Sequence, residues 1–171
     1  MISVICGIDP GLAATGYAAL RVDGAAPSVL DAGVCRVREA LPLAQRLERL
    51  ERDLALVLRE HRPAIVAVEE LYAHYAHPRT AILMGHARGV ILSTAARNGL
   101  EVRSYAATRI KRYLTGNGRA AKGQIQRAVQ RELGLAVLPE PPDLADALAI
   151  ALCCAADVAR RSPAQMRPLR R

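Results

Sequence analysis

Four acidic residues stand where a folded chain could bring their carboxylates together. Asp9 and Glu69 each end a short apolar segment. Asp143 and Asp146 stand three positions apart at the start of another, a spacing that puts two side chains on one side of a helix. Two carboxylates about 4 Å apart repel each other by about 4 kcal/mol at an effective dielectric near 20, so a cluster of four needs a cation. Mg²⁺ and Mn²⁺ prefer oxygen ligands, and the four acids therefore predict a site for one of these ions.

Two of the acids follow segments with the pattern of buried strands. Residues 2–9 and 64–68 are short apolar runs without alternation, typical of strands that are covered on both faces. If these strands are parallel neighbours, Asp9 and Glu69 meet at the same edge of the sheet, which is where ligands bind in open α/β sheets. The turn signal Pro10-Gly11 directly after Asp9 fits this position.

Each acid taken alone has a simpler structural explanation. A single Asp at the end of a strand more often forms an Asx turn than a metal ligand. Asp143 is also a good helix N-cap. Asp146 is harder to explain in this way, because it stands directly before the apolar residues of a helix that must bury one face. The hypothesis of a metal site therefore depends on the acids meeting in space.

The rest of the chain alternates between strand and helix patterns. Strands are predicted at residues 2–9, 17–22, 28–37, 64–68 and 102–105, and helices at 41–62, 78–97 and 143–159, with shorter helical pieces after residue 105. The order of elements predicts an α/β fold with a five-stranded mixed sheet, its first three strands an antiparallel meander, flanked by helices. No internal repeat or linker divides it. We therefore expect one domain over residues 1–159 and a basic, disordered tail over 160–171.

The positive charge is concentrated in one segment. The formal net charge of +8 comes from 22 Arg and only two Lys against 16 acidic residues. Val102–Arg131 holds eight of the basic residues and no acidic one, and it includes both lysines. Such a segment favours a polyanionic partner such as nucleic acid, since neutralised phosphates release counterions. On charge alone, a solvated basic face is an equally good explanation.

Other patterns exclude whole classes of protein. The N-terminal apolar run lacks a preceding basic region, and Asp9-Pro10 interrupts it too early for a secretion signal. The apolar run Ala147–Ala156 is far shorter than the roughly 20 residues of a membrane-spanning helix. The four cysteines show neither a CxxC pair nor a zinc-ligand spacing, and are most simply small buried hydrophobes. We expect a soluble, cytoplasmic protein without membrane contact or structural zinc.

Five segments resemble, in order and in spacing, the RuvC family of bacterial Holliday junction resolvases. They are Gly7–Gly11 with Thr15–Tyr17, Val68–Tyr72, Gly85–Gly89, Thr115–Gln124 and Asp143–Ala149. The resemblance runs from residue 2 to about residue 155. It implies an RNase H-like fold and a magnesium-dependent endonuclease that nicks two symmetry-related strands of a four-way DNA junction in recombination and repair. The products implied are a 5′-phosphate and a 3′-hydroxyl.

The resemblance also implies roles for single residues. Asp9, Glu69, Asp143 and Asp146 fall on the family's catalytic acids. They would hold two Mg²⁺ ions, with Mn²⁺ as the alternative. Two metal ions about 3.5 to 4 Å apart activate a water on one side of a phosphate and stabilise the leaving oxygen on the other.

DNA contacts are implied around this site. Lys111 and Lys122 fall where the family has lysines near the DNA backbone and the active site. A compact ammonium group approaches a scissile phosphate as a point charge or donates a proton to it, so Lys122 is also predicted to be catalytic. Arg112 and Arg119 belong to the same basic segment and are expected to contact DNA. Tyr72 stands where relatives often have Phe, in a loop at the junction centre, and can stack on a base.

The remaining expectations concern partners. Two nicks at symmetry-related strands call for two active sites, which predicts a homodimer, and Ala81–Ala96 is the candidate interface. The resemblance implies collaboration with the RuvA and RuvB branch-migration proteins. It leaves the roles of Tyr75 and His86 open.

Two other classes of function compete with this interpretation. A nucleotide-binding ATPase of the actin and sugar-kinase type also opens with a strand, an Asp and a Gly-rich turn, but it needs two comparable domains. A noncatalytic junction-binding module would keep the basic segment and has no need for four convergent acids.

Overall fold

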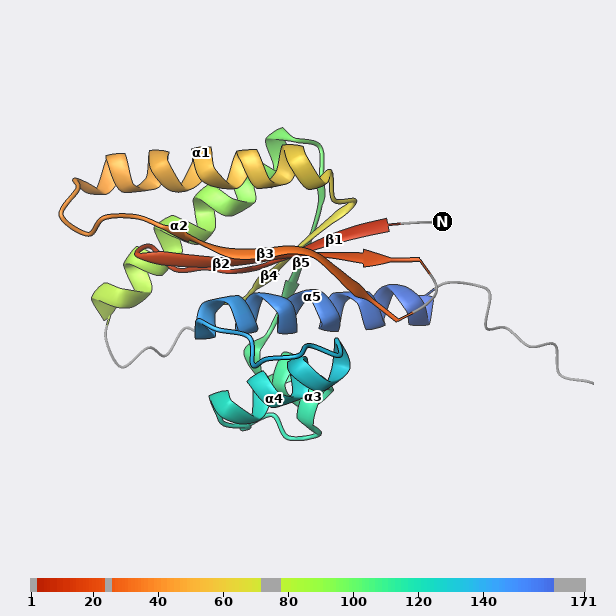
Figure 1. Ribbon diagram of the computed structural model, residues 1–171. Helices are drawn as coiled ribbons and strands as arrows, with labels where there is room; N and C mark the ends of the chain where they lie inside the picture. Colours follow the sequence, from red (N-terminus) through yellow and green to blue (C-terminus); the bar gives the residue numbers. More distant parts are fainter. Residues whose placement is uncertain (1–2, 24–25, 72–77, 162–171) are drawn as a thin grey trace, which may run out of the picture.

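A five-stranded mixed sheet forms the centre of the protein. The computed structural model describes residues 3–23, 26–71 and 78–161 of the 171-residue chain. The strands are β1 (Ser3–Asp9), β2 (Ala14–Val22), β3 (Ser28–Arg36), β4 (Ile65–Glu69) and β5 (Glu101–Tyr105). Their order across the sheet is β3-β2-β1-β4-β5 (Figure 1). The first three strands are antiparallel and the last two run parallel to β1, so the predicted mixed sheet and meander are confirmed.

Helices cover both faces of the sheet. On one face lie α1 (Leu43–His61) and α2 (Pro78–Arg97). On the other lies α5 (Pro142–Arg161), with the short helices α3 (Ala107–Thr115) and α4 (Lys122–Glu132) packed against it (Figure 1). Because both faces are covered, β1 and β4 need apolar side chains on each side. This is why their sequences do not alternate.

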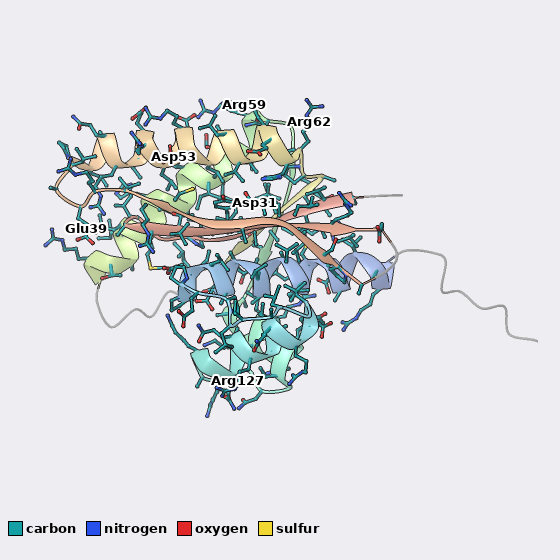
Figure 2. All side chains as sticks on the ribbon, in the orientation of Figure 1. Asp31, Glu39, Asp53, Arg59, Arg62 and Arg127 are labelled. Atoms are coloured by element: carbon teal, nitrogen blue, oxygen red, sulfur yellow. The ribbon has the colours of Figure 1, made fainter. Side chains whose placement is uncertain are left out.

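The alternation of faces is visible in β1. Ile5 belongs to the core under α5, whereas Cys6 and Ile8 belong to the core under α1 and α2. On α1, Leu54 and its apolar neighbours at helical spacing are buried in this second core, while Figure 2 shows Arg59 on the side of the helix away from the sheet. The strand and helix periods of the sequence therefore correspond to real faces.

Element boundaries differ from the sequence prediction by a few residues. β2 begins at Ala14 rather than at residue 17, because its ladder with β3 continues to the pair Ala14 and Arg36. The last helix runs from Pro142 to Arg161, beyond the predicted end at residue 159. The first long helix ends one residue earlier than predicted, at His61.

Helix α5 approaches the sheet closely because two glycines stand opposite it. A Cβ atom on Gly7 would overlap the carbonyl oxygen of Ala147, and one on Gly16 would overlap the carbonyl oxygen of Asp143. In both cases the obstructing atom is backbone, which cannot move aside as a flexible side chain can. Most of α5 from Ala145 onward is buried in this contact. The glycines of β1 and β2 therefore set the position of α5.

The cysteines are buried and free, as the sequence predicts. Burial is the main cause that raises the pKa of the Cys6 thiol to about 12 and those of Cys35 and Cys153 to about 11. Within the described residues, no helix combines the length and the apolar character needed to cross a lipid bilayer.

A substitution at Gly16 tests the contact between α5 and the sheet. Gly16→Ala is expected to lower the free energy of unfolding by about 1 to 3 kcal/mol, the usual cost of overpacking, because the new methyl group meets backbone. Gly123→Ala is the control, since its Cβ would stand 3.5 Å from the flexible end of Arg127. Denaturant unfolding of both variants measures the difference, and equal stabilities would contradict the close contact.

Candidate active site

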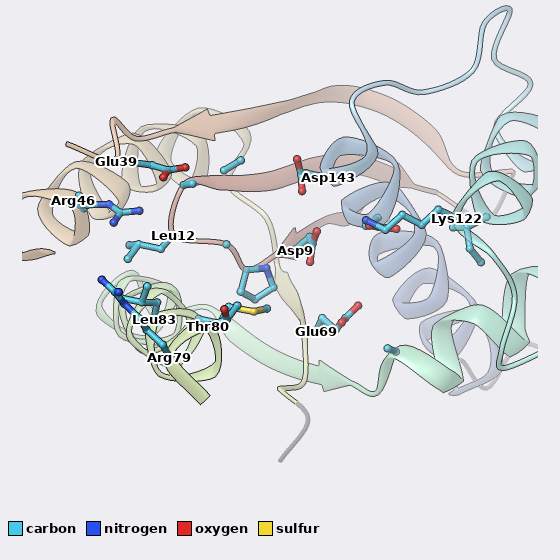
Figure 3. Close-up of a pocket in the computed structure, with 18 of the residues that line it drawn as sticks. Asp9, Leu12, Glu39, Arg46, Glu69, Arg79, Thr80, Leu83, Lys122 and Asp143 are labelled. Carbon is cyan, nitrogen blue, oxygen red and sulfur yellow. The ribbon is translucent and has the colours of Figure 1, made fainter. Parts of the chain in front are cut away.

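Asp9 and Glu69 lie at the same edge of the sheet. Each is the last residue of its strand, and the two strands pair in parallel with Ile8 opposite Val68. Both side chains line an open cleft of about 880 Å³ (Figure 3). The structure therefore places Asp9 and Glu69 at one edge of the sheet, where the sequence predicted that they would meet.

The N-terminal part of α5 brings two more acids to this cleft. Asp143 and Asp146 both line it, and Figure 3 shows Asp143 on the side of the cleft where Asp9 and Lys122 also lie. Their position follows from the contact of the Asp143 backbone with Gly16, the residue paired with Asp9 in the sheet. Four acids from three elements thus share one cavity.

Burial and neighbouring charges raise the pKa of Asp9, Glu69 and Asp146. Burial first, and then the charges of Asp146, Glu69 and Asp143, raise the pKa of Asp9 to about 8. Burial and the Asp146 charge raise the pKa of Glu69 to about 7. Burial also raises the pKa of Asp146, and Asp143 adds to that shift. Like charges held together in this way disfavour ionisation unless a cation is present.

Two lysines at the same end of the cleft oppose these shifts. Lys111 on α3 and Lys122, the first residue of α4, both line it. The charge of Lys122 lowers the pKa of Asp9, and both lysines lower those of Glu69 and Asp146. The start of α4 is closed by Gln124, whose side-chain oxygen accepts the N–H of Ala121 at 2.8 Å. The hydrogen-bonded start of α4 therefore holds the backbone of Lys122 in place beside the cleft.

Two predicted DNA-contacting arginines lie outside the cleft. Arg112 on α3 and Arg119 in the α3–α4 connection are exposed and do not line it. The N–H of Arg119 donates to the side chain of Asn117 at 2.9 Å, which orders this turn. His86 is exposed on α2 and is also absent from the cleft lining. Tyr72 and Tyr75 lie outside the described residues.

Hydrogen bonds fix the ends of the strands that carry the acids. Thr15 is fully buried, and its hydroxyl donates to the carbonyl oxygen of Gly11, closing the turn after Asp9. Beyond β4, the N–H of Glu70 donates to the carbonyl oxygen of Tyr105 at 2.9 Å. The backbone beneath Asp9 and Glu69 is therefore held on both strands.

Arg88 is a residue whose contact the sequence did not predict. From α2, its Nε donates to the carbonyl oxygen of Glu69 at 3.2 Å, and its Nη2 donates to the hydroxyl of Ser104 at 2.8 Å. It ties α2 to the ends of β4 and β5. The available signal was an arginine inside a largely apolar helix, within the Gly85–Gly89 motif.

The donor set suits a divalent cation. Its ligands are carboxylate oxygens, which Mg²⁺ and Mn²⁺ prefer. Burial, and after it the neighbouring carboxylates, raise the pKa of Asp9 and Glu69, and a bound cation would favour their ionised forms. Within the described ranges, no three Asp, Glu, His or Cys side chains stand close enough to hold one ion as they are placed. Repulsion opposes their closer approach until a cation neutralises it. The residues fit such an ion by chemistry and charge.

Comparison with known proteins identifies the family. Residues 5–154 match the family described as crossover junction endodeoxyribonuclease RuvC. The chain belongs to the RuvC family. RuvC of Rhodopirellula baltica is 50% identical over 151 residues, which cover 88% of this chain and 85% of the relative. RuvC of Heliobacterium modesticaldum is 45% identical over 152 residues, covering 89% of this chain and 93% of the relative.

Solved structures agree with this membership. The structure described as Thermus thermophilus RuvC in complex with Holliday junction substrate has a TM-score of 0.85 at 37% identity, and covers 92% of this chain and 95% of that one. The yeast mitochondrial Holliday junction resolvase Ydc2 matches with a TM-score of 0.65 at 13% identity, which shows a shared fold alone. The RNase H-like fold implied by the sequence motifs is confirmed, and the chain is a RuvC-family nuclease.

The raised pKa values predict how the metal-free RuvC-family protein responds to pH. Ordinary carboxyl pKa values near 4 apply to the unfolded chain, so between about pH 5 and about pH 8 the folded protein binds more protons than the unfolded one. Stability is therefore highest at the acidic end and falls as pH rises through the folded values of about 7 for Glu69 and about 8 for Asp9.

Thermal melting in the presence of a chelator measures this dependence. Asp9→Asn removes one of the repelling charges, and should raise the melting temperature near pH 8 and flatten its fall with pH. Glu48→Gln, on the exposed face of α1, is the control and should keep the slope of the parent protein. An unchanged slope in Asp9→Asn would show that these carboxylates are not coupled to folding.

Proposed function

We propose that this chain resolves four-way DNA junctions by metal-dependent nicking, with Asp9, Glu69, Asp143 and Asp146 holding Mg²⁺. The observation that carries the proposal is the convergence of four acids from β1, β4 and α5 on one cleft beside two lysines. Family membership supports it, as does the likeness to a RuvC structure whose description names a Holliday junction substrate. Two ions are expected, and Mn²⁺ is the alternative metal.

Each group has a distinct task in phosphodiester hydrolysis. When bound, the metal ions would supply an activated water and stabilise the leaving oxygen. The carboxylates of Asp9 and Glu69 hold their place because their strands are fixed at the turn after β1 and by Arg88. Lys122 and Lys111 bring positive charge to the phosphate at the same end of the cleft as the acids. In-line displacement then leaves a 5′-phosphate and a 3′-hydroxyl.

The alternatives explain the cleft less well. A noncatalytic junction-binding module would gain nothing from acids that raise one another's pKa, and repulsion near a polyanion would weaken its binding. An ATPase of the actin and sugar-kinase type encloses its nucleotide between two comparable domains. The described residues form one sheet with its covering helices.

Cleavage of a synthetic four-way junction tests the proposal. Asp9→Asn, Glu69→Gln and Asp146→Asn are each expected to abolish nicking in Mg²⁺ while junction binding persists, because they remove a ligand oxygen charge and leave the basic surface intact. Gel separation of nicked strands and a binding titration measure the two quantities. Near-normal nicking by any of these variants would contradict its role.

The same assay examines the lysines against a control. Lys122→Ala should slow cleavage more than it weakens binding, since its charge reaches Asp9, Glu69 and Asp146. Arg131→Ala, on the exposed end of α4, removes the same charge outside the cleft and should not slow cleavage of bound junction. Equal losses of binding and cleavage in Lys122→Ala would count against a catalytic position.

Several finer features belong to the same proposal. The sequence predicts one nuclease domain over residues 1–159 and a basic tail over 160–171, but α5 runs to Arg161, so the domain extends to the end of that helix and the basic tail follows it. The protein works in the cytoplasm with the RuvA and RuvB proteins. Arg112 and Arg119 extend the DNA-contacting surface from α3 and its following turn. Tyr72 stacks on bases at the junction centre.

A homodimer is part of the proposal, because a two-fold axis places two active sites on a two-fold substrate. The exposed stripe of α2 supports this helix as the interface: Ile82, His86, Gly89 and Ser93 share one side, and Ile82 is 62% exposed. Burying such an apolar side chain favours association.

Sedimentation tests the dimer and its interface. The protein should sediment as a dimer, and Ile82→Asp should shift it toward the monomer by placing a charge in the interface. Leu56→Asp is the control, since Leu56 is 53% exposed on α1. A monomeric parent protein, with and without junction, would contradict the dimer, and a dimeric Ile82→Asp would move the interface elsewhere.

A further inference from the structure

We propose that the end of the cleft opposite the carboxylates is a second phosphate site, in which Arg46 and Arg79 hold a non-scissile backbone phosphate of the bound DNA. The inference rests on the proposed function, because it takes DNA as the substrate. It assigns a task to two arginines that neither the sequence motifs nor the acid cluster explains.

The cleft has two chemically different ends. One end carries the four acids with Lys111 and Lys122. The other is lined by residues from the turn after β1, from the β3–α1 connection and from the starts of α1 and α2, among them Leu12, Glu39, Arg46, Arg79, Thr80 and Leu83. Figure 3 shows Arg46 and Arg79 at this second end, away from Asp143 and Lys122. One cavity therefore connects the reacting end to a site with two guanidinium groups.

Arg46 carries a hydrogen-bond donor that has no acceptor among the described residues. Its Nε is buried from solvent, and within the described part of the chain this atom has no hydrogen-bond partner. A buried, unsatisfied donor on a charged group costs free energy. A phosphate oxygen entering the cleft would satisfy it, and guanidinium is the side chain best suited to bind a phosphate through two parallel hydrogen bonds.

Both arginines stand in the first turn of a helix, where positive charge is unfavourable. Arg46 is in the first turn of α1 and Arg79 in the first turn of α2, and neither turn contains an acidic residue. Helix N-termini carry partial positive charge and favour acidic side chains. The arginines add to this potential instead of offsetting it, and a bound anion removes the cost.

Within the part of the chain that the structure describes, no carboxylate forms an ion pair with either guanidinium group. Among residues 3–23, 26–71 and 78–161, neither Arg46 nor Arg79 is within ion-pair distance of an acid, although many other arginines are paired. Glu39 lines the same end but is exposed and unpaired with either arginine within those ranges. The end therefore keeps a net positive charge. An extended polyanion places one phosphate at the acids with their cations and another here.

The first experiment measures binding without cleavage. Arg46→Ala and Arg79→Ala are made in the Asp9→Asn background, and the affinity for a four-way junction is titrated at several salt concentrations. Arg59→Ala is the matched control, because it removes the same charge from the same helix as Arg46 but on the outer face (Figure 2). Each cleft variant should bind about tenfold more weakly, with a salt slope lowered by about one. Arg59→Ala should change neither quantity.

A second measurement identifies the phosphate. Single methylphosphonates, which are neutral, are placed along the cleaved strand on either side of the scissile bond. At one non-scissile position the substitution should weaken binding of the Asp9→Asn protein about tenfold, yet add almost nothing to Arg46→Ala. Losses that add at every position would overturn the inference.

The remaining outcomes separate folding from binding and this inference from the proposed function. If Arg46→Ala lowers the melting temperature, Arg46→Lys replaces it: it keeps the charge but has no group equivalent to Nε, so the affinity loss should persist, and full affinity would overturn the assignment. An unchanged salt slope in both cleft variants also overturns it. Either result leaves nicking by the unsubstituted protein in Mg²⁺ intact, whereas failure of that protein to bind and cut a junction overturns both.

Discussion

The backbone contact between α5 and the β1–β2 pair is the constraint on which the site depends. Gly7 and Gly16 leave room for the carbonyl groups of the helix, and any side chain there would push α5 away from the sheet. The displacement would move Asp143 and Asp146 away from Asp9. Two residues without functional groups thus decide whether the carboxylates of α5 belong to the same site as the strand carboxylate. A change in the packing of α5 on the sheet would therefore also change the carboxylate site.

Neither end of the cleft is neutralised by the side chains that the structure describes, and bound cations and phosphates would supply the missing charge. At one end, burial and then the neighbouring carboxylates raise the pKa of Asp9 and Glu69, and the lysines only partly offset these shifts. At the other, two arginines lack acidic partners within the described residues. Neither end is at its lowest electrostatic energy in the free protein. Cations at the acidic end and a backbone phosphate at the arginine end would neutralise both. The arrangement of charge along the cleft would therefore determine the direction in which the DNA backbone lies.

The sequence predicted the strands, the helices and the meeting of Asp9 with Glu69, because these follow from local periodicity and from parallel strands ending at one edge. It also led to Asp146, a charge directly before the apolar residues of a helix. It did not predict the contact of Arg88 with the Glu69 carbonyl, or the place of Arg46 in the cleft. Those depend on side chains reaching across separate elements, and a single basic residue on a helix looks the same whether it faces solvent or a cavity. The proximity of Gly16 to α5 likewise needed the tertiary structure.

The burial of all four cysteines has a practical consequence for watching this enzyme at work. Thiolates, not thiols, react with maleimides, and thiols that are both enclosed and raised in pKa are poor targets for such labels. One new cysteine on an exposed surface, for example in place of Val137 in the connection before α5, would carry a fluorophore while the native cysteines stay in place. The chain is also free of Trp, so an indole added there would be its sole emitter of that kind. A single added label or Trp would therefore give a fluorescence signal that no native cysteine or Trp shares, and this signal could be used to time the opening of the junction.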